Sequence, residues 1–263
     1  MEGIFLEPKE LRQLIRDGSF NKNTSGACDD FVQANLAIVP KEYAFDFFLY
    51  TYRNPKPCPV IDILEAGEVE SRLAKGSDVR TDIPLYHVFK DGGLVEKKSS
   101  ITDIWQDDFV TFLIGCSFTF ESQLVKNGIR LRHIDCNKNV AMYKTNIETT
   151  PAGPFKGPLV VSMRPIKNKD LDLAKAITEK FPNMHGGPVH AGDPLLIGIE
   201  NIEHPDYGEF VEIKEDETPV FWACGVTPQA AAIEAKLPIM ITHAPGHMFV
   251  TDWTNEAYLK NGM

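Results

Sequence analysis

The feature of this sequence that most constrains its fold is an uninterrupted apolar run that ends in glycine and passes directly into a helical pattern. Residues 108–116 read Asp-Phe-Val-Thr-Phe-Leu-Ile-Gly-Cys, and residues 117–126 then have a helical pattern. An apolar strand of this kind is typical of a sheet that is covered on both faces. The same strand–turn–helix order recurs at 219–237, and a short apolar strand follows at 239–242. We therefore expect an α/β layer structure with a largely parallel core.

The first part of the chain supplies further elements of this main layer. We expect helices at 8–15 and 42–52, the second rich in aromatic residues and buried, and strands at 32–40 and 60–64. The dipeptide Asp-Gly at 91–92 predicts a hairpin turn between two short strands.

The middle of the chain has a different order of expected elements. We expect strands at 140–146 and 158–163, one amphipathic helix at 169–181, and two more strands at 195–199 and 210–213. A β-β-α-β-β order suits a small two-layer α+β domain. The predicted fold class is therefore α/β, a three-layer α/β sandwich with an inserted smaller two-layer α+β domain. We place the main domain at 1–130 and 217–263 and the inserted domain at 131–216.

Charge and cysteine content narrow the classes of partner and compartment. The formal charge of −10 argues against nucleic acid and membrane as partners, because both require a basic face. A small acidic metabolite remains a suitable ligand, since a few local N–H groups and one arginine dominate at short range. The five cysteines lack a CxxC spacing, and no secretory or membrane-spanning run is present, so we expect reduced thiols in a cytoplasmic protein. A homo-oligomer is left open.

Two turns in the last fifty residues have the composition of an anion site. In the first, an apolar strand ends at Cys224 and Gly225, where Thr227 is a good helix N-cap and Pro228 suits the first helical position. A strand that runs straight into a capped helix leaves backbone N–H groups free to bind a carboxylate or phosphate. In the second turn, His243 and the nearby His247 flank a Pro-Gly pair, which places titratable groups near the predicted anion site.

Several longer motifs resemble a known family. The stretches that carry the resemblance are Phe31-Val32-Gln33-Ala34-Asn35-Leu36, Asn54-Pro55-Lys56-Pro57-Cys58-Pro59, Leu113-Ile114-Gly115-Cys116-Ser117-Phe118-Thr119-Phe120-Glu121, Met142-Tyr143-Lys144-Thr145-Asn146, Val160-Val161-Ser162-Met163-Arg164-Pro165, His185-Gly186-Gly187-Pro188-Val189-His190-Ala191-Gly192-Asp193-Pro194 and the two turns above. Over nearly its whole length the chain closely resembles the D-glutamate cyclase family, whose bacterial members are often labelled hydro-lyases. The resemblance implies an α/β sandwich with a smaller α+β domain. It also implies a lyase of amino-acid metabolism that removes water from D-glutamate to give 5-oxo-D-proline.

The roles of individual catalytic residues rest on chemistry alone. His243 and His247 are the leading general acid/base candidates, because a histidine pKa near neutrality suits proton transfer; the alternative is that one of them is a hydrogen-bonded structural histidine. Cys224 ends a predicted strand at a helix N-terminus, where a thiol can be acidified, or it is a small core residue. Glu121, one turn into the first helix, is either a general base or a complement to the helix dipole.

The candidate substrate-binding residues fall into three groups. The Gly115-Cys116-Ser117 turn and the turn that holds Gly225 and Thr227 are proposed carboxylate and oxyanion donors, or ordinary connections that need glycine for close packing. Arg164 suits bidentate binding of a carboxylate, or an ion pair between the domains. His185 and His190 are candidate substrate contacts on a Gly/Pro loop.

These residues support three functional hypotheses. The first is a cofactor-free lyase that works by general acid/base catalysis in a cleft between the domains. The second is a metal-dependent hydro-lyase acting on a hydroxy acid, in which His185, His190 and Asp193 join the C-terminal histidines. Their spacing matches no standard zinc motif, so we expect neither metal nor cofactor. The third is a non-catalytic binding protein for a small acidic metabolite.

Overall fold

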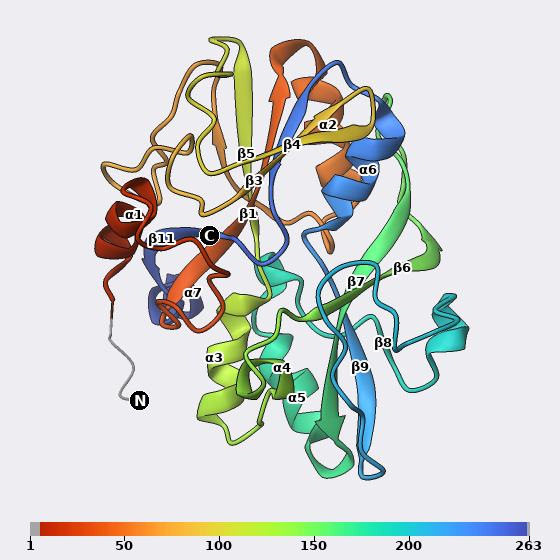
Figure 1. Ribbon diagram of the computed structural model, residues 1–263. Helices are drawn as coiled ribbons and strands as arrows, with labels where there is room; N and C mark the ends of the chain where they lie inside the picture. Colours follow the sequence, from red (N-terminus) through yellow and green to blue (C-terminus); the bar gives the residue numbers. More distant parts are fainter. Residues whose placement is uncertain (1–5, 262–263) are drawn as a thin grey trace.

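The strands of the computed structural model, which describes residues 6–261, form two sheets (Figure 1). The larger sheet contains β1 (Phe31–Pro40), β2 (Val60–Leu64), β3 (Tyr86–Lys90), β4 (Gly93–Lys98), β5 (Phe109–Gly115), β10 (Met240–His243) and β11 (Phe249–Thr254). Its order is β2-β5-β1-β10-β3-β4, and β11 also pairs with β1. The smaller sheet contains β6 (Ala141–Glu148), β7 (Pro158–Lys167), β8 (His190–Ala191) and β9 (Glu217–Ala223), in the order β6-β7-β9-β8.

Helices cover parts of both sheets. The α-helices are α1 (Pro8–Arg16), α2 (Lys41–Arg53), α3 (Phe118–Lys126), α4 (Arg132–Asp135), α5 (Leu171–Thr178), α6 (Thr227–Ala235) and α7 (Asn255–Asn261). Short 3-10 turns occur at η1 (Asn168–Asp170), η2 (Pro182–Met184) and η3 (Pro194–Ile197). The predicted α/β class is confirmed, and the predicted helix at 8–15, the strand at 32–40 and the hairpin at 91–92 are each observed.

The expectation of a largely parallel core is wrong, because the strand pairs of both sheets are antiparallel. The reason lies in where each strand–turn–helix unit leads the chain. After β5, helices α3 and α4 carry the chain into β6 of the smaller sheet, and after β9, α6 carries it back into β10 of the larger one. Neither unit therefore returns to lay a parallel strand beside the one it left.

The central strands of the larger sheet are buried on both faces, whereas β4 at its edge is exposed. All seven residues of β5 are buried, as its apolar run predicted. On one face, Leu36 and Ile38 of β1 pack against irregular segments that include Val79 and Ile101. On the other face, the alternate β1 residues pack against α2 and α6, as the strand period of two requires.

Helix α2 is buried on one side only, which corrects the expectation of a buried helix at 42–52. Phe47 and Tyr50 are fully buried against the larger sheet. Phe45 and Tyr52, on the other side, are 72% and 74% exposed.

The two faces of the smaller sheet have different partners. Trp222 of β9 packs toward α3 and α5, whereas its neighbour Phe221 packs toward the segment that follows β8. The strands predicted at 195–199 and 210–213 are absent from that segment. Pro194 instead begins η3, and Phe210 packs its side chain onto the face of the sheet without joining its edge.

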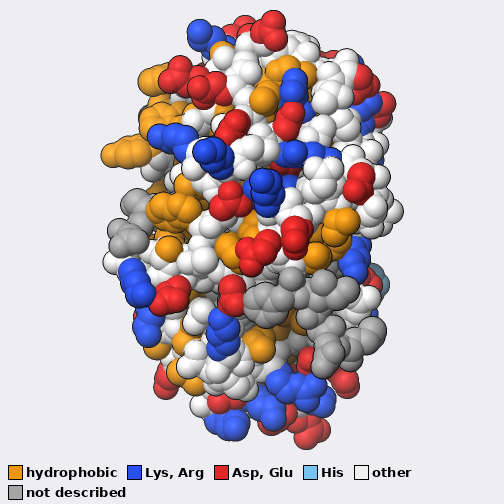
Figure 2. All heavy atoms as spheres, turned by 90° about the vertical axis from the view of Figure 1, so that its left-hand side faces the viewer, with side chains coloured by type: hydrophobic (Ala, Val, Ile, Leu, Met, Phe, Trp, Pro, Cys, Tyr) orange, Lys and Arg blue, Asp and Glu red, His pale blue; other side chains and the backbone are white. Residues whose placement is uncertain are grey.

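The predicted division of the chain into a main domain and an inserted domain stays a prediction. The proposed boundary at 217 coincides with the start of β9, which belongs to the smaller sheet. Among the described residues, no helix combines the length and the apolar character needed to cross a membrane. On the face that carries α1, acidic and basic side chains are interspersed (Figure 2).

Candidate functional site

The two strand-to-helix turns that sequence analysis proposed as anion donors lie together in the interior. Cys116, after β5, and Cys224, after β9, belong to one buried cluster that also contains Met248. Asn35 lies between the two turns: its Nδ2 donates to the Gly115 carbonyl oxygen at 2.7 Å. A Cβ atom on Gly225 would lie only 2.0 Å from the same Nδ2, so glycine is required there.

The thiols of the two turns are protonated near neutral pH. Burial raises the pKa of Cys224 to about 11, although the N–H of Val226 and the charge of Arg164 act in the opposite direction. Burial likewise raises the pKa of Cys116, against the opposing effect of the Phe118 N–H. This favours a proton donor or a core residue over an acidified nucleophile.

Arg164 is engaged in a buried ion pair between α3 and β7. Its Nε and Nη2 donate to Oε1 of Glu121 at 2.8 and 2.5 Å. Nη2 also donates to the Ser117 hydroxyl at 2.9 Å, and Nη1 donates to that of Ser162 at 3.0 Å. The guanidinium carbon lies 5.5 Å from the ring centroid of Phe120 and 5.4 Å from that of Trp222. Of the two roles proposed for Arg164, the structure shows the ion pair.

Glu121 is correspondingly held in its charged form. Burial alone would raise its pKa, but the charges of Arg164 and His133 and their hydrogen bonds outweigh burial and lower it to about 2. The Nε2 of His133 lies 3.2 Å from the same Oε1. A carboxylate this strongly stabilised is a weak general base at neutral pH.

His243 fills a gap along β1. Its Nδ1 lies 3.1 Å from the backbone nitrogen and 3.2 Å from the carbonyl oxygen of Leu36. Leu36 lies between the part of β1 that pairs with β10 and the part that pairs with β11. Its Nε2 is buried and has no hydrogen-bond partner in the described protein. Burial lowers the pKa of His243 to about 3, so the ring is neutral at pH 7.

Two more histidines lie close to His243. His247 is half-buried, its Nδ1 lies 3.1 Å from the Pro245 carbonyl oxygen, and burial lowers its pKa. His87, on the neighbouring strand β3, has its pKa lowered to about 4 by burial and by the charges of Lys97 and His247. Sequence reasoning missed His87 as a neighbour, because only the β3–β10 register brings it beside the second turn.

His185 lies in another part of the interior, on the loop that follows η2. Its backbone is left-handed, with φ of 76°, and its Nδ1 lies 2.9 Å from the carbonyl oxygen of Lys56. Its Nε2 is buried without a partner among the described residues, and burial lowers its pKa to about 4. A Cβ atom on Gly115 would lie 1.8 Å from the Asn183 carbonyl oxygen, so the loop of His185 packs directly on the end of β5.

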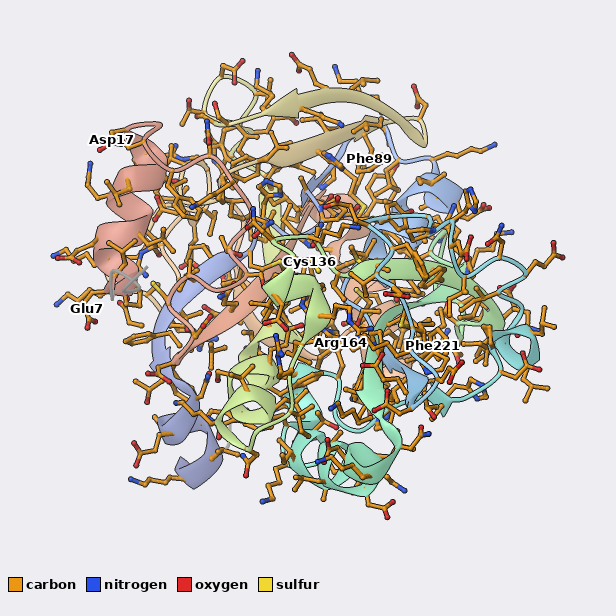
Figure 3. The ribbon with its side chains drawn as sticks, turned by 60° about the horizontal axis from the view of Figure 1, so that its bottom comes forward. Glu7, Asp17, Phe89, Cys136, Arg164 and Phe221 are labelled. Carbon is orange, nitrogen blue, oxygen red and sulfur yellow. The ribbon has the colours of Figure 1, made fainter. Side chains whose placement is uncertain are left out.

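The structure does not bring His190 to this group. In register with Phe221, it stacks on that ring with centroids 5.8 Å apart. Phe221 lies on the face of the smaller sheet opposite Arg164 (Figure 3). Its Nε2 lies 2.8 Å from the backbone oxygen of Asp193.

Thr227 lies beside the second turn, but it does not cap α6 as predicted. Val226 is the N-cap, and no side-chain hydrogen bond caps the helix. The Thr227 hydroxyl donates instead to the Cys224 carbonyl oxygen at 2.7 Å and accepts from the Val160 N–H at 3.1 Å. These bonds hold the turn against β7.

The histidines and Asp193 are not gathered into a metal-binding arrangement. Within residues 6–261, no group of three or more His, Cys, Asp and Glu side chains is placed to hold a metal ion.

Comparison with known proteins relates most of the chain to one family. Residues 110–252 match the family model described as D-glutamate cyclase. A protein of Geobacillus kaustophilus named "Putative hydro-lyase" is 56% identical over 95% of this chain and 96% of its own. "Putative hydro-lyase YcsI" of Bacillus subtilis is 52% identical over 96% of this chain and 98% of its own. A solved nitrogen repressor-like protein of Methanococcus jannaschii aligns with a TM-score of 0.39 and 10% identity, covering 95% of this chain and 99% of its own, which is too distant to carry an argument.

Proposed function

Because the chain belongs to the D-glutamate cyclase family, we propose that it converts D-glutamate to 5-oxo-D-proline and water. The observation that supports this proposal is the meeting of two strand-to-helix turns at Asn35, with both thiols in one buried cluster. Met248, which follows His247 in the chain, packs in that cluster, so the second histidine turn adjoins the thiols.

The reaction requires the movement of two protons. The substrate ammonium must lose one proton before its nitrogen attacks the γ-carboxyl carbon. The new C–N bond gives a tetrahedral oxyanion, and a second proton leaves the nitrogen as the amide forms. The departing oxygen receives two protons in total, the C–O bond breaks, and the oxygen leaves as water. Substrate and product carry the same net charge, so the protein needs only to relay protons.

The groups of the site have suitable protonation states for this relay. Of the two histidines of the second turn, His247 suits proton transfer: its lowered pKa leaves the ring neutral and able to accept a proton from the substrate nitrogen at pH 7. His243, with a pKa lowered to about 3, is too weak a base for this step. The protonated thiols of Cys116 and Cys224 are proton donors for the departing oxygen. N–H groups at the start of α3 and α6 are proposed to stabilise the oxyanion, because helix N-termini favour negative charge.

The direct test is to incubate the purified protein with D-glutamate or L-glutamate and follow 5-oxoproline by NMR. We expect turnover of the D-isomer, and His247→Ala is expected to lower the rate ~10²-fold or more if its ring transfers a proton. His204→Ala, which changes an exposed histidine, is the matched control and should retain the wild-type rate. Absence of turnover of either isomer by folded protein would contradict the proposed substrate.

A non-catalytic binding protein for a small acidic metabolite is the second candidate. It is favoured by the mutual engagement of Arg164 and Glu121, which removes two reactive groups from the proposed machinery. Stabilisation of the fold by glutamate without any chemical change would support binding alone. An activity that is lost on chelation and restored by a stoichiometric metal would instead support the metal-dependent hydro-lyase.

A further inference from the structure

A cavity of about 980 Å³ opens between the C-terminal end of α2 and the loop that carries His185. One wall comes from α2 and the proline-rich segment after it, including Arg53 and Lys56. The opposite wall comes from the smaller-sheet part of the chain, including Glu179 and His185. The loop that carries His185 also packs on Gly115, so one wall of the cavity is in contact with the end of β5.

The cavity concentrates positive charge in a chain whose net charge is −10. Arg53 and Lys56 are both exposed and line it, against the single carboxylate of Glu179. No carboxylate of the described part of the chain lies within 4.0 Å of either cation, so neither is neutralised by an ion pair. Partial burial lowers the pKa of Lys56, against the attraction of Glu179.

His185 supports the same wall from the interior. A carbonyl oxygen can only accept, so the 2.9 Å contact with Lys56 assigns the ring proton to Nδ1 and leaves Nε2 as an acceptor in the neutral ring. Nε2 is buried with the rest of the side chain, which is only 1% exposed, and the ring also faces the backbone of Gly115, so it lies behind the wall of the cavity. The left-handed backbone at this non-glycine residue is strained, and strain of this kind gathers at ligand sites.

Arg164 gives an independent reason to look for an anion anchor here. Sequence analysis assigned it to the substrate carboxylate, but its guanidinium is committed to Glu121 and Ser117. A carboxylate ligand therefore needs another cation, and Lys56 is unpaired and lines a cavity beside the turn.

We propose that this cavity binds a small acidic amino acid, one carboxylate of which pairs with Lys56. Arg53, at the rim, adds to the attraction for the anion. The inference deepens the proposed function, on which it rests for the identity of the amino acid as glutamate. Binding itself is independent of turnover.

The test measures binding of glutarate and D-glutamate by calorimetry to wild-type protein and to Lys56→Gln. Glutarate lacks the amine and cannot cyclise, so its binding reports on the carboxylate anchor alone. We expect Lys56→Gln to weaken both ligands ~10-fold or more, and Lys56→Arg to restore most of the affinity. Lys156→Gln removes the same charge from an exposed position outside the cavity and should bind as wild type.

The outcomes separate this inference from the proposed function. Wild-type affinity of Lys56→Gln for both ligands, or no saturable binding of either ligand by folded wild-type protein, would overturn the inference. Turnover of D-glutamate with an unchanged KM in Lys56→Gln would also overturn it and leave the proposed function standing. Binding that depends on Lys56, without any 5-oxoproline formed, would support the inference and contradict the lyase.

Discussion

The buried pair of Glu121 and Arg164 allows a sharp prediction about stability. Glu121→Gln keeps the shape of the side chain but removes its charge, which leaves a guanidinium of 0% exposure without a counter-charge. Breaking a buried pair by removing one partner costs ~3–5 kcal/mol, because the remaining charge stays desolvated. For a chain of this size that loss lowers the midpoint of thermal unfolding by roughly 6 to 20 °C.

Thermal unfolding followed by circular dichroism or calorimetry measures this effect. The matched control is Glu256→Gln, which neutralises a carboxylate in an exposed pair with Lys260 and should leave the midpoint unchanged. Replacing both buried partners in the double variant Glu121→Leu/Arg164→Met should recover much of the loss, since no unpaired charge remains. A midpoint within about 2 °C of wild type for Glu121→Gln would refute the reasoning, because it corresponds to only about 1 kcal/mol.

The same pair predicts part of the acid sensitivity of the fold. The folded-state pKa of Glu121 is about 2, below its ordinary value of 4.5, so the unfolded chain binds more protons between these values. The stabilisation from Glu121 is therefore fully present above pH 4.5 and is lost as the pH falls toward 2. Glu121→Gln should lack this component of the pH dependence, which denaturant titrations across that range would measure.

Three further predictions follow from packing, exposure and burial. Gly225→Ala should destabilise the fold by ~1–3 kcal/mol in denaturant titrations, because its Cβ would clash with Asn35, whereas Gly93→Ala has room for a methyl group and should be tolerated better. Ellman's reagent should react quickly with one thiol of the native protein, the exposed Cys136, and Cys136→Ser should abolish this fast reaction. Two or more fast-reacting thiols would contradict the burial pattern of the cysteines. The free energy of unfolding should fall as the pH drops from 6.5 toward 3, since His243 stays neutral in the fold but is protonated in the unfolded chain. His243→Asn should reduce that slope by up to ~1.4 kcal/mol per pH unit, and an unchanged slope would contradict the assignment.

The sequence predicts elements better than it predicts how they pair. The run at 108–116 identifies a buried strand because seven consecutive positions must avoid water on both faces, and β5 is such a strand. The direction of its neighbours depends on where α3 leads the chain, which no local pattern specifies. The apolar residues at 210–213 were mistaken for a strand for a related reason: packing onto a sheet needs the same side chains as belonging to it.

The candidate site shows the same contrast between what the sequence predicts and what depends on packing. Repetition of one strand–turn–helix device at Cys116 and Cys224 predicts two similar turns, and the structure brings them together in one cluster. The partners of Arg164 were not predictable, because they depend on which face of β7 is turned toward α3. Lys56 was passed over because it lies within a proline-rich segment that was expected to be irregular. The structure places it in a turn that the Cys58 N–H closes by donating to the Asn54 carbonyl oxygen at 3.0 Å.

His185 and His190 show how strongly backbone geometry decides the use of a side chain. They are five residues apart on one Gly/Pro loop, yet only His185 faces the interior near the turns. The position of His190 is fixed by the β8–β9 register, in which Val189 N–H donates to the Phe221 carbonyl oxygen at 2.7 Å. Because side chains alternate along a strand, a shift of one residue would turn His190 toward the face that carries Arg164. A histidine cluster read from the sequence is thus divided by the pleat of one short strand, and any chemistry that needs both rings together would have to break the hydrogen bonds of β8.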